Sequence, residues 1–494
     1  MVPRLSPAGR IVAIVASTVV TSAMIKTRFF FSILLLAATF SQGLAAIPGL
    51  TNRAVNVDIL IVGGTIITMN PEREVIENGA IAIDDGRIYM VGTRGIVSRN
   101  SRAKRVIDAT GKLIIPGLIN THTHAAMSLF RGISDDLDLN DWLTKFIFPA
   151  EAKNVTEPFV RAGTRLALAE MIRGGTTTYC DMYYFEDAVA DETKKAGVRG
   201  VLGETIIKFP VSDNKTPEAA LSYTENFIKK WKNDPLIVPA AAPHAPYTLE
   251  TATLRSIKEQ SDRLNSAVVI HVAETKKERD DILAQYGKTP AAYLNSIGFL
   301  SDRTIAAHSV WVTGDEIDMY KAAGVGSAHC PQSNMKLASG TAPVPAMLAK
   351  DVAVGLGTDG AASNNDLNMW EEMDTAAKLH KLITNDPKTL PAEQAFEMAT
   401  IRGARALHLD KITGSLEAGK RADIAIVDFD SLHQTPAYNY FSHLVYATKA
   451  SDVRTVIING RLVMLNRRLL TLNENGIKKD ANAYRKKIID SLGK

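Results

Sequence analysis

A chain of 494 residues is too long for one ordinary hydrophobic core, so the sequence predicts several domains or one large barrel with an appendage. Hydrophobic residues make up 46% and charged residues 22%, proportions that exclude an intrinsically disordered chain. The formal net charge of +4 comes from residues 1–46, which hold four basic residues and no acid. The neutral remainder gives no electrostatic reason to expect a nucleic-acid partner.

The first 46 residues are typical of a secretory signal peptide. Two apolar runs, at residues 11–23 and 29–40, are separated by Lys26 and Arg28, and small residues follow at positions 43–46. We expect cleavage near this point, which predicts an exported protein, periplasmic or secreted, with no stable membrane association after cleavage. An uncleaved membrane anchor and a cytoplasmic protein are the alternatives.

Segments typical of β-strands, with Gly-Gly, Asp-Gly and Asn-Gly turns, occupy both ends of the remaining chain. They predict a small β-sandwich composed of residues 57–114 and 416–470. Residues 471–494 follow as a basic amphipathic helix, which we interpret as a solvated surface element.

The middle of the chain, residues 115–415, repeats a different pattern. Short apolar strands alternate with segments of helical periodicity, and this predicts an α/β fold, a (β/α)₈ TIM barrel with the β-sandwich appended. The eight strands are expected at Lys112–Asn120, Thr176–Tyr184, Arg199–Ile207, Ile237–Tyr247, Ala267–Glu274, Thr304–Val312, Val325–Cys330 and Val352–Thr358.

Histidines gather at the carboxyl ends of these expected strands, where barrel active sites are built. In PGLINTHTHAAM, His122 and His124 alternate with one residue between them, so both project to one side of a strand and can share a metal ion. A chance His-x-His on a surface is the alternative. The apolar run LIIPGLIN before the pair argues against it.

Three later strands add further candidates. His271 ends the fifth strand in VVIHVAET, and Glu274 follows three residues later. His308 ends the sixth strand, and Asp359 follows the eighth. Three neutral imidazoles and a carboxylate suit Zn²⁺ or Fe²⁺, with one position left open for water.

The motifs PGLINTHTH, HVAET, AAH and GTDGAASNN, between the two β-rich ends, resemble those of the amidohydrolase superfamily. Within it the chain is similar to the 5-methylthioadenosine/S-adenosylhomocysteine deaminases and their chlorohydrolase relatives, from about Val57 to Leu470. No lysine ends the fourth strand, where two-metal members carry one, so one divalent ion is expected, with Zn²⁺ preferred. The resemblance implies four metal ligands and two proton-transfer residues: His122, His124, His271 and Asp359, and then Glu274 and His308.

The chemistry also follows from the residues themselves. An aromatic amidine carbon is a poor electrophile, and a divalent ion lowers the pKa of its bound water toward ~7. Asp359 and His308 can accept the proton of that water. Glu274 can protonate the ring nitrogen beside the attacked carbon, after which the amino group leaves as ammonia. The alternative for Glu274 is that it only orients His271.

Four other residues are assigned to the substrate pocket. The resemblance makes His244, in APHAPYT, a contact of a purine ring nitrogen, and it matches Glu151, in FPAE, to a glutamate that binds ribose hydroxyls. Trp142 lies in the same long loop, as a lid residue over the site. His329, which ends the seventh strand, is expected to be part of the pocket wall. A structural role is the alternative for His244, and ordinary lid packing is the alternative for Trp142.

One position departs from the family pattern. Some members carry an arginine on the third strand that binds the homocysteine carboxylate, and this chain has Glu204 there. An acid would repel a carboxylate, which favours methylthioadenosine or adenosine over S-adenosylhomocysteine, unless another arginine compensates.

Three hypotheses about function remain. The first is deamination of a purine nucleoside, a small-molecule substrate. The second is displacement of chloride or an amine from another heteroaromatic ring, such as a triazine. The third is an inactive secreted metal-binding barrel, against which Glu274 and His308 argue because binding an ion needs neither. The sequence is also compatible with a homo-oligomer.

Overall fold

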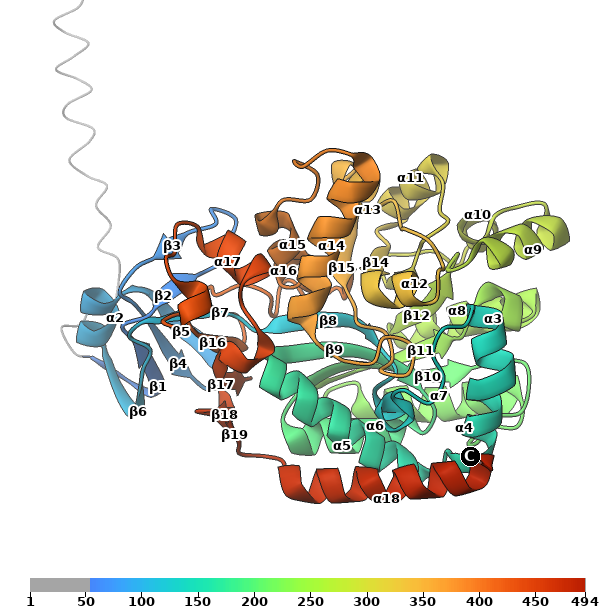
Figure 1. Cartoon of the computed structure of the whole chain (residues 1–494), viewed down its shortest axis with the longest axis horizontal. Helices are drawn as coiled ribbons and strands as arrows, with labels where there is room; N and C mark the ends of the chain where they lie inside the picture. Colours follow the sequence, from blue (N-terminus) through green and yellow to red (C-terminus); the bar gives the residue numbers. More distant parts are fainter. Residues whose placement is uncertain (1–53, 494) are drawn as a thin grey trace, which may run out of the picture. The chain divides into compact units, whose positions relative to one another are not determined.

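The structure, a computed structural model, describes residues 54–493 (Figure 1). The expected signal peptide, residues 1–46, lies outside the described residues. Within the described part of the chain, no helix is both long and apolar enough to span a membrane. Cys180 and Cys330 are both buried and carry free thiols.

Eight parallel strands form the central sheet, and their spatial order follows the chain from β8 to β15. The backbone N–H of Asp359, just after β15, donates to the carbonyl oxygen of His122 on β8 at 2.9 Å, so the last strand returns to the first. This confirms the (β/α)₈ barrel. The strands are β8 (Leu118–Thr123), β9 (Thr176–Tyr183), β10 (Arg199–Ile206), β11 (Ile237–Pro243), β12 (Ala267–Val272), β13 (Thr304–His308), β14 (Gly326–His329) and β15 (Ala353–Leu356).

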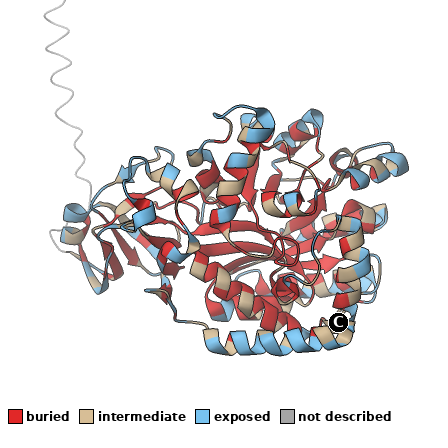
Figure 2. Ribbon diagram, viewed as in Figure 1, coloured by how far each residue is buried: buried red, intermediate tan, exposed pale blue. Residues whose placement is uncertain are grey.

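Helices cover the outer face of the barrel, which is why its strands are buried on both sides (Figure 2). Several of them begin at a threonine whose hydroxyl accepts a backbone N–H three residues on, as Thr275 does for Glu278. The main helices are α5 (Glu157–Gly174), α6 (Glu186–Ala196), α7 (Pro217–Trp231), α8 (Thr251–Leu264), α9 (Lys276–Tyr286), α10 (Pro290–Ser296), α11 (Gly314–Ala323), α12 (Pro331–Lys336), α13 (Val344–Ala349), α14 (Met369–Thr384), α15 (Ala392–Met398) and α16 (Ile401–Ala406).

The amino-terminal end of the barrel is closed by α16. The carbonyl oxygen of Ala406 lies so near Gly326 that a Cβ there would be 1.9 Å from it, and only glycine permits this approach. Leu407 and Leu409 after α16 join the apolar cluster inside the barrel. The apolar residues fill the barrel interior toward its amino-terminal end, so the polar side chains of the site lie at the carboxyl-terminal end.

Two further sheets flank the barrel, with strand orders β5-β4-β1-β6 and β19-β18-β17-β16-β7-β2-β3. The second joins the two ends of the chain, because β16 pairs antiparallel with β7. An isoleucine-rich core is shared by strands of both sheets. The strands are β1 (Val55–Val62), β2 (Thr65–Ile67), β3 (Val75–Ile76), β4 (Gly79–Asp84), β5 (Arg87–Thr93), β6 (Ser101–Asp108), β7 (Lys112–Pro116), β16 (Ile424–Asp428), β17 (Val453–Ile458), β18 (Arg461–Leu465) and β19 (Arg468–Leu469).

The expected first barrel strand, Lys112–Asn120, is two strands. Its first half is β7 of the flanking sheet and its second half is β8 of the barrel, divided at Gly117. A Cβ at Gly117 would lie 2.1 Å from the side chain of Thr177, so this glycine lets the chain pass tightly from one sheet into the other.

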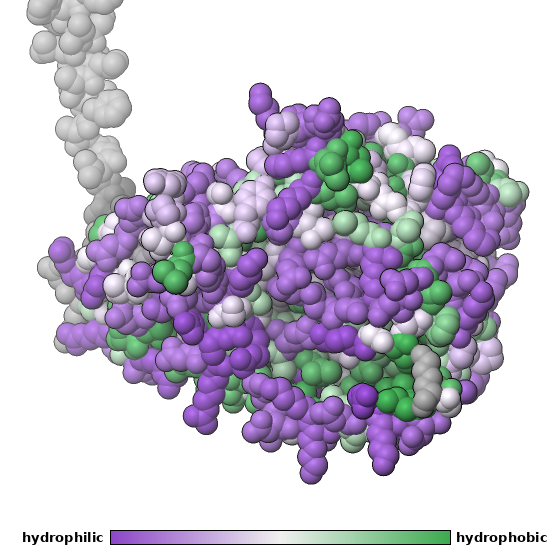
Figure 3. Space-filling view, in the orientation of Figure 1, coloured by the Kyte–Doolittle hydropathy of each residue, from purple (hydrophilic) through white to green (hydrophobic). Residues whose placement is uncertain are grey.

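A helical lid and the last helix complete the described chain. The lid follows β8 and consists of α3 (Leu139–Asp141), the π-helix η2 (Trp142–Ile147) and α4 (Phe148–Asn154). The last helix, α18 (Glu474–Leu492), packs along α5 and reaches α4 (Figure 1). Hydrophilic side chains line the lower edge of Figure 3, where α18 lies. The remaining short helices of the described residues are α2 (Arg94–Asn100), α17 (Tyr440–Tyr446) and the 3-10 helices η1 (Ala125–Phe130), η3 (Pro246–Thr248), η4 (Leu432–Gln434) and η5 (Ala450–Asp452).

Candidate metal centre and substrate pocket

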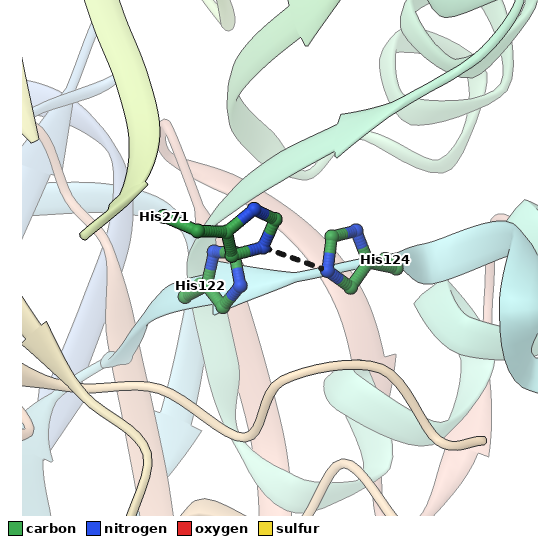
Figure 4. Close-up of side chains that lie close together, drawn as sticks. All are labelled: His122, His124 and His271. Carbon is green, nitrogen blue, oxygen red and sulfur yellow. Dashed lines mark hydrogen bonds between the residues drawn. The ribbon is translucent and has the colours of Figure 1, made fainter. Parts of the chain in front are cut away.

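Four side chains from three parts of the barrel converge at its carboxyl-terminal end. His122 and His124 come from the end of β8, His271 from β12, and Asp359 from the segment after β15. Figure 4 shows the three imidazole rings facing one another. Their donor atoms and Asp359 fall into two overlapping groups of potential metal ligands, the second of which includes His308.

The distances within this cluster fit one divalent ion. The Nε2 atoms of His124 and His271 are 3.4 Å apart. Asp359 Oδ1 lies 3.6 Å from His122 Nε2 and 3.3 Å from His124 Nε2. Ligand atoms bonded tetrahedrally at 2.0–2.1 Å are separated by about 3.4 Å. Nε2 of His122, the nitrogen near Asp359, is buried without a hydrogen-bond partner in the described chain, as a metal ligand would leave it.

Backbone carbonyls orient two of the imidazoles. His124 Nδ1 is 2.6 Å from the Met182 carbonyl oxygen, and His271 Nδ1 is 2.7 Å from the His244 carbonyl oxygen. Each Nδ1–H therefore donates to a carbonyl, which leaves Nε2 as the metal ligand. Burial first, and then the neighbouring histidines, lower the pKa values of His122 and His271 well below the ordinary value. Both rings are thus neutral, the form that binds a cation.

Asp359 is held as a carboxylate despite its burial. Burial alone raises its pKa, but nearby His124 and His308 and a hydrogen bond from Ser333 bring the pKa below the ordinary value. Ser333 Oγ and Ser363 Oγ donate to Oδ2 at 2.6 and 2.9 Å. The other oxygen, Oδ1, faces the histidines.

Glu274 and His308 form a second pair beside the cluster. Glu274 Oε2 lies 3.8 Å from His308 Nε2. Burial, and then the charge of Asp359, raise the pKa of Glu274 well above its ordinary value, which favours the protonated form of this carboxyl. His308 Nδ1 lies 2.9 Å from the amide oxygen of Asn334 and donates to it, which leaves Nε2 free to accept a proton.

A pocket opens onto these residues and is covered by the lid. His244, Glu151 and Trp142 all line it. Tyr183 Oη donates to Glu151 at 2.7 Å, and burial raises the pKa of Glu151 to about 7. Burial, and then His124, lower the pKa of His244 to about 3, so its ring is neutral. The remaining lining is mainly apolar and aromatic, and includes Leu139, Leu143, Ile147, Phe148, Tyr184, Tyr247 and Leu337.

Two expectations about the pocket were wrong. His329 is not among the residues that line it, and its Nε2 lies 3.2 Å from that of His380 instead. Glu204 also points away from the pocket. Its carboxyl accepts the backbone N–H of Glu186 at 3.0 Å and the side-chain amide of Asn214 at 2.9 Å, whereas the next residue, Thr205, lines the pocket. Glu204 therefore cannot repel a substrate carboxylate directly.

Sequence reasoning missed two supporting side chains. Tyr183 holds Glu151, and Asn334 fixes the imidazole of His308. Tyr183 ends β9, so the rule that directed attention to strand ends would have found it. Asn334 lies on α12, and no local pattern links it to His308.

Comparison with known proteins agrees with this geometry. The amidohydrolase family model matches residues 113–463. A protein of Syntrophobacter fumaroxidans named 5-methylthioadenosine/S-adenosylhomocysteine deaminase is 48% identical, over 82% of this chain and 92% of its own length. A protein of Methanosarcina acetivorans named 5'-deoxyadenosine deaminase is 43% identical, also over 82% of this chain and 92% of its own length.

Solved structures share the fold. An adenosine deaminase from Xanthomonas campestris with bound zinc has a TM-score of 0.87 and 38% identity, and the match covers 88% of this chain and 99% of that one. The atrazine chlorohydrolase of Arthrobacter aurescens has a TM-score of 0.80 and 24% identity, over 86% of this chain and 100% of that one, and this likeness extends to the fold alone.

Proposed function

Because the chain belongs to the amidohydrolase family, we propose that it is a metal-dependent deaminase that hydrolyses the amino group of adenosine-type nucleosides. The observation that carries this proposal is the pair of Glu274 and His308, with Oε2 and Nε2 3.8 Å apart, beside a cation site and lining a pocket. The names of two relatives, 5-methylthioadenosine/S-adenosylhomocysteine deaminase and 5'-deoxyadenosine deaminase, support the same substrate class.

The chain's own residues supply the proton transfers. A divalent ion, when bound, lowers the pKa of a coordinated water toward ~7. Asp359 and His308 Nε2 accept the proton of the attacking water. Glu274, neutral because it is buried, donates to the ring nitrogen beside the attacked carbon and makes that carbon electrophilic. The proton taken from the water then passes to the amino group, which leaves as ammonia, and the remaining hydroxyl proton returns to Glu274 to give the inosine-type product. We propose Zn²⁺ as the ion, since histidine and carboxylate ligands at this spacing suit it.

Substrate specificity follows from the pocket lining. The Glu151 carboxylate can accept hydrogen bonds from both ribose hydroxyls, and His244 can contact the purine ring. Within residues 54–493, the lining contains no lysine or arginine. The carboxylate of S-adenosylhomocysteine would be desolvated there without a counter-charge. Adenosines with an uncharged 5' group, such as methylthioadenosine, are therefore the preferred substrates.

The decisive test is an ammonia-release screen of the purified protein loaded with Zn²⁺, with metal content measured on the same sample. We expect ammonia from methylthioadenosine, 5'-deoxyadenosine or adenosine. No ammonia from any adenosine analogue, pterin, cytosine or guanine would overturn the deaminase proposal, and chloride release from chlorotriazines would favour the second hypothesis. Equal turnover of S-adenosylhomocysteine would indicate that a cation near the pocket binds its carboxylate. Lys208 would then be the candidate, because its Nζ lies 3.5 Å from the carbonyl oxygen of Tyr247, which lines the pocket.

We also propose that the protein is exported, on the basis of the signal-peptide pattern of residues 1–46. Cell fractionation tests this. Recovery of the full-length chain in the cytosol would contradict it.

A further inference from the structure

The turn after β12 has an unusual backbone. Ala273 lies between the ligand His271 and the proton donor Glu274, and its φ is +52°. A residue with a Cβ rarely adopts this left-handed conformation, and such strained residues persist only where surrounding contacts hold them. Since Glu274 follows directly, the conformation of this turn determines where the Glu274 carboxyl lies.

One buried carboxyl group accepts both backbone N–H groups of this turn. Glu278 Oε1 accepts the backbone N–H of Ala273 at 2.9 Å, and Oε2 accepts that of Glu274 at 2.8 Å. Glu278 is the third residue of α9, and its own N–H donates to the hydroxyl of Thr275 at 3.1 Å. Hydrogen bonds through Glu278 therefore connect the first turn of α9 to the turn that carries Glu274.

Glu278 belongs neither to the metal cluster nor to the pocket lining. It is nevertheless only 5% exposed, and burial of a carboxyl is costly unless its hydrogen bonds compensate. The hydrogen bonds that compensate for this burial come from the backbone N–H groups of Ala273 and Glu274.

We propose that Glu278 is a positioning residue for the reaction. The two oxygens of its carboxyl group accept the backbone N–H groups of Ala273 and Glu274, which stabilises the left-handed turn at Ala273 and thereby fixes Glu274 within reach of the substrate ring nitrogen. This inference rests on the proposed deaminase function, in which Glu274 is the proton donor.

The test compares two glutamine variants. Glu278→Gln keeps the size of the side chain but presents an amide NH₂ to one of the two backbone N–H groups. We expect kcat per metal-loaded enzyme to fall about 10- to 100-fold, because small misplacements of a catalytic group have effects of this order, while KM and metal content stay unchanged.

Glu316→Gln is the matched control. Glu316 is the third residue of α11, is 1% exposed, and accepts the backbone N–H groups of Thr313 and Ala292 at 2.8 and 3.0 Å, but it does not line the pocket. We expect its kcat to stay at the wild-type value even where its melting temperature falls. Equal kcat in the two variants would overturn the inference, whereas a wild-type protein that releases no ammonia would overturn the proposed function itself.

A second variant separates positioning from folding. Glycine adopts a positive φ without the steric penalty of a Cβ. In the double variant Ala273→Gly/Glu278→Gln we therefore expect part of the lost kcat to return. A double variant no faster than Glu278→Gln would contradict the inference.

Discussion

Glu274 and Asp359 are two buried carboxyls that face the same histidines, yet their pKa values shift in opposite directions. Glu274 contacts His308, and burial and the charge of Asp359 favour its neutral form, whereas Asp359 is surrounded by imidazoles and two serine hydroxyls that favour its ionised form. Opposite environments for two acids are how one site holds a proton donor and an acceptor at the same pH.

The first prediction concerns Glu274→Gln. The amide keeps the shape of the carboxyl but cannot deliver a proton, so kcat for deamination should fall ~10²–10⁴-fold. Metal content, measured by elemental analysis, should stay at the wild-type level because Glu274 is not among the four expected ligands. Near-normal turnover would remove Glu274 from the mechanism.

The second prediction concerns pH and Glu151. With a pKa of about 7, this carboxyl loses its charge as the pH falls through neutrality, and it then accepts ribose hydroxyls poorly. The KM for adenosine should rise about tenfold between pH 8 and pH 6 if only the ionised form binds. 2',3'-Dideoxyadenosine lacks both hydroxyls, so its KM should stay flat, and a parallel rise for both substrates would refute the assignment.

At the scale of elements, the lid is braced from outside. Asn154, at the end of α4, donates to Ser491 Oγ of α18 at 2.8 Å, and Lys153 Nζ donates to the Ser491 carbonyl oxygen at 3.2 Å. Glu151 lies one turn earlier on the same helix. The last helix, expected to be a solvated surface element, therefore contacts the element that carries the proposed ribose ligand.

The third prediction tests this brace. Asn154→Ala should raise the KM for adenosine about threefold with kcat little changed, since the side-chain hydrogen bonds to Ser491 Oγ and to the Ala150 carbonyl oxygen are lost. Arg165→Ala is the control, because Arg165 contacts Asp480 of the same helix at 3.3 Å away from the lid. Steady-state kinetics of the two variants should differ, and equal KM values would show that the brace does not affect binding.

The positions of the strand ends could be predicted from the sequence, but the direction in which each side chain points could not. Periodicity located the strands, and the rule for barrel active sites then led to His122, His271 and Asp359. Barrel strands are buried on both faces, so apolar and polar residues do not alternate along them. The sequence of β10 therefore gives no sign that Thr205 faces the pocket and Glu204 does not, and the same ambiguity misplaced His329.

At the scale of the whole molecule, as far as residues 54–493 describe it, a buried ion pair links the barrel to the flanking sheets. Arg199 on β10 and Asp423, just before β16, lie 3.0 Å apart with side chains 3% and 0% exposed. Asp423 also accepts the backbone N–H of Asn459 at 2.7 Å. Sequence alone could not reveal this pair, because its partners are more than 200 residues apart and neither belongs to a motif.

The fourth prediction follows from this pair. Asp423→Asn leaves the Arg199 charge buried without a counter-charge and should lower the free energy of unfolding by about 3–5 kcal/mol. Asp428→Asn removes the partner of Arg454 in a more exposed pair and should change it by only about 0–1 kcal/mol. Urea denaturation measures both, and equal shifts would refute the role of burial.

The pairing of β7 with β16 has a consequence for biosynthesis. Residues 116 and 424 are neighbours in the sheet, but the ribosome makes them about 300 residues apart. At ~5–20 residues per second, β7 lacks this neighbour for roughly 15 to 60 seconds. During that interval its open edge is available to other nascent chains, so slow translation or early termination should favour aggregates over partly folded monomers.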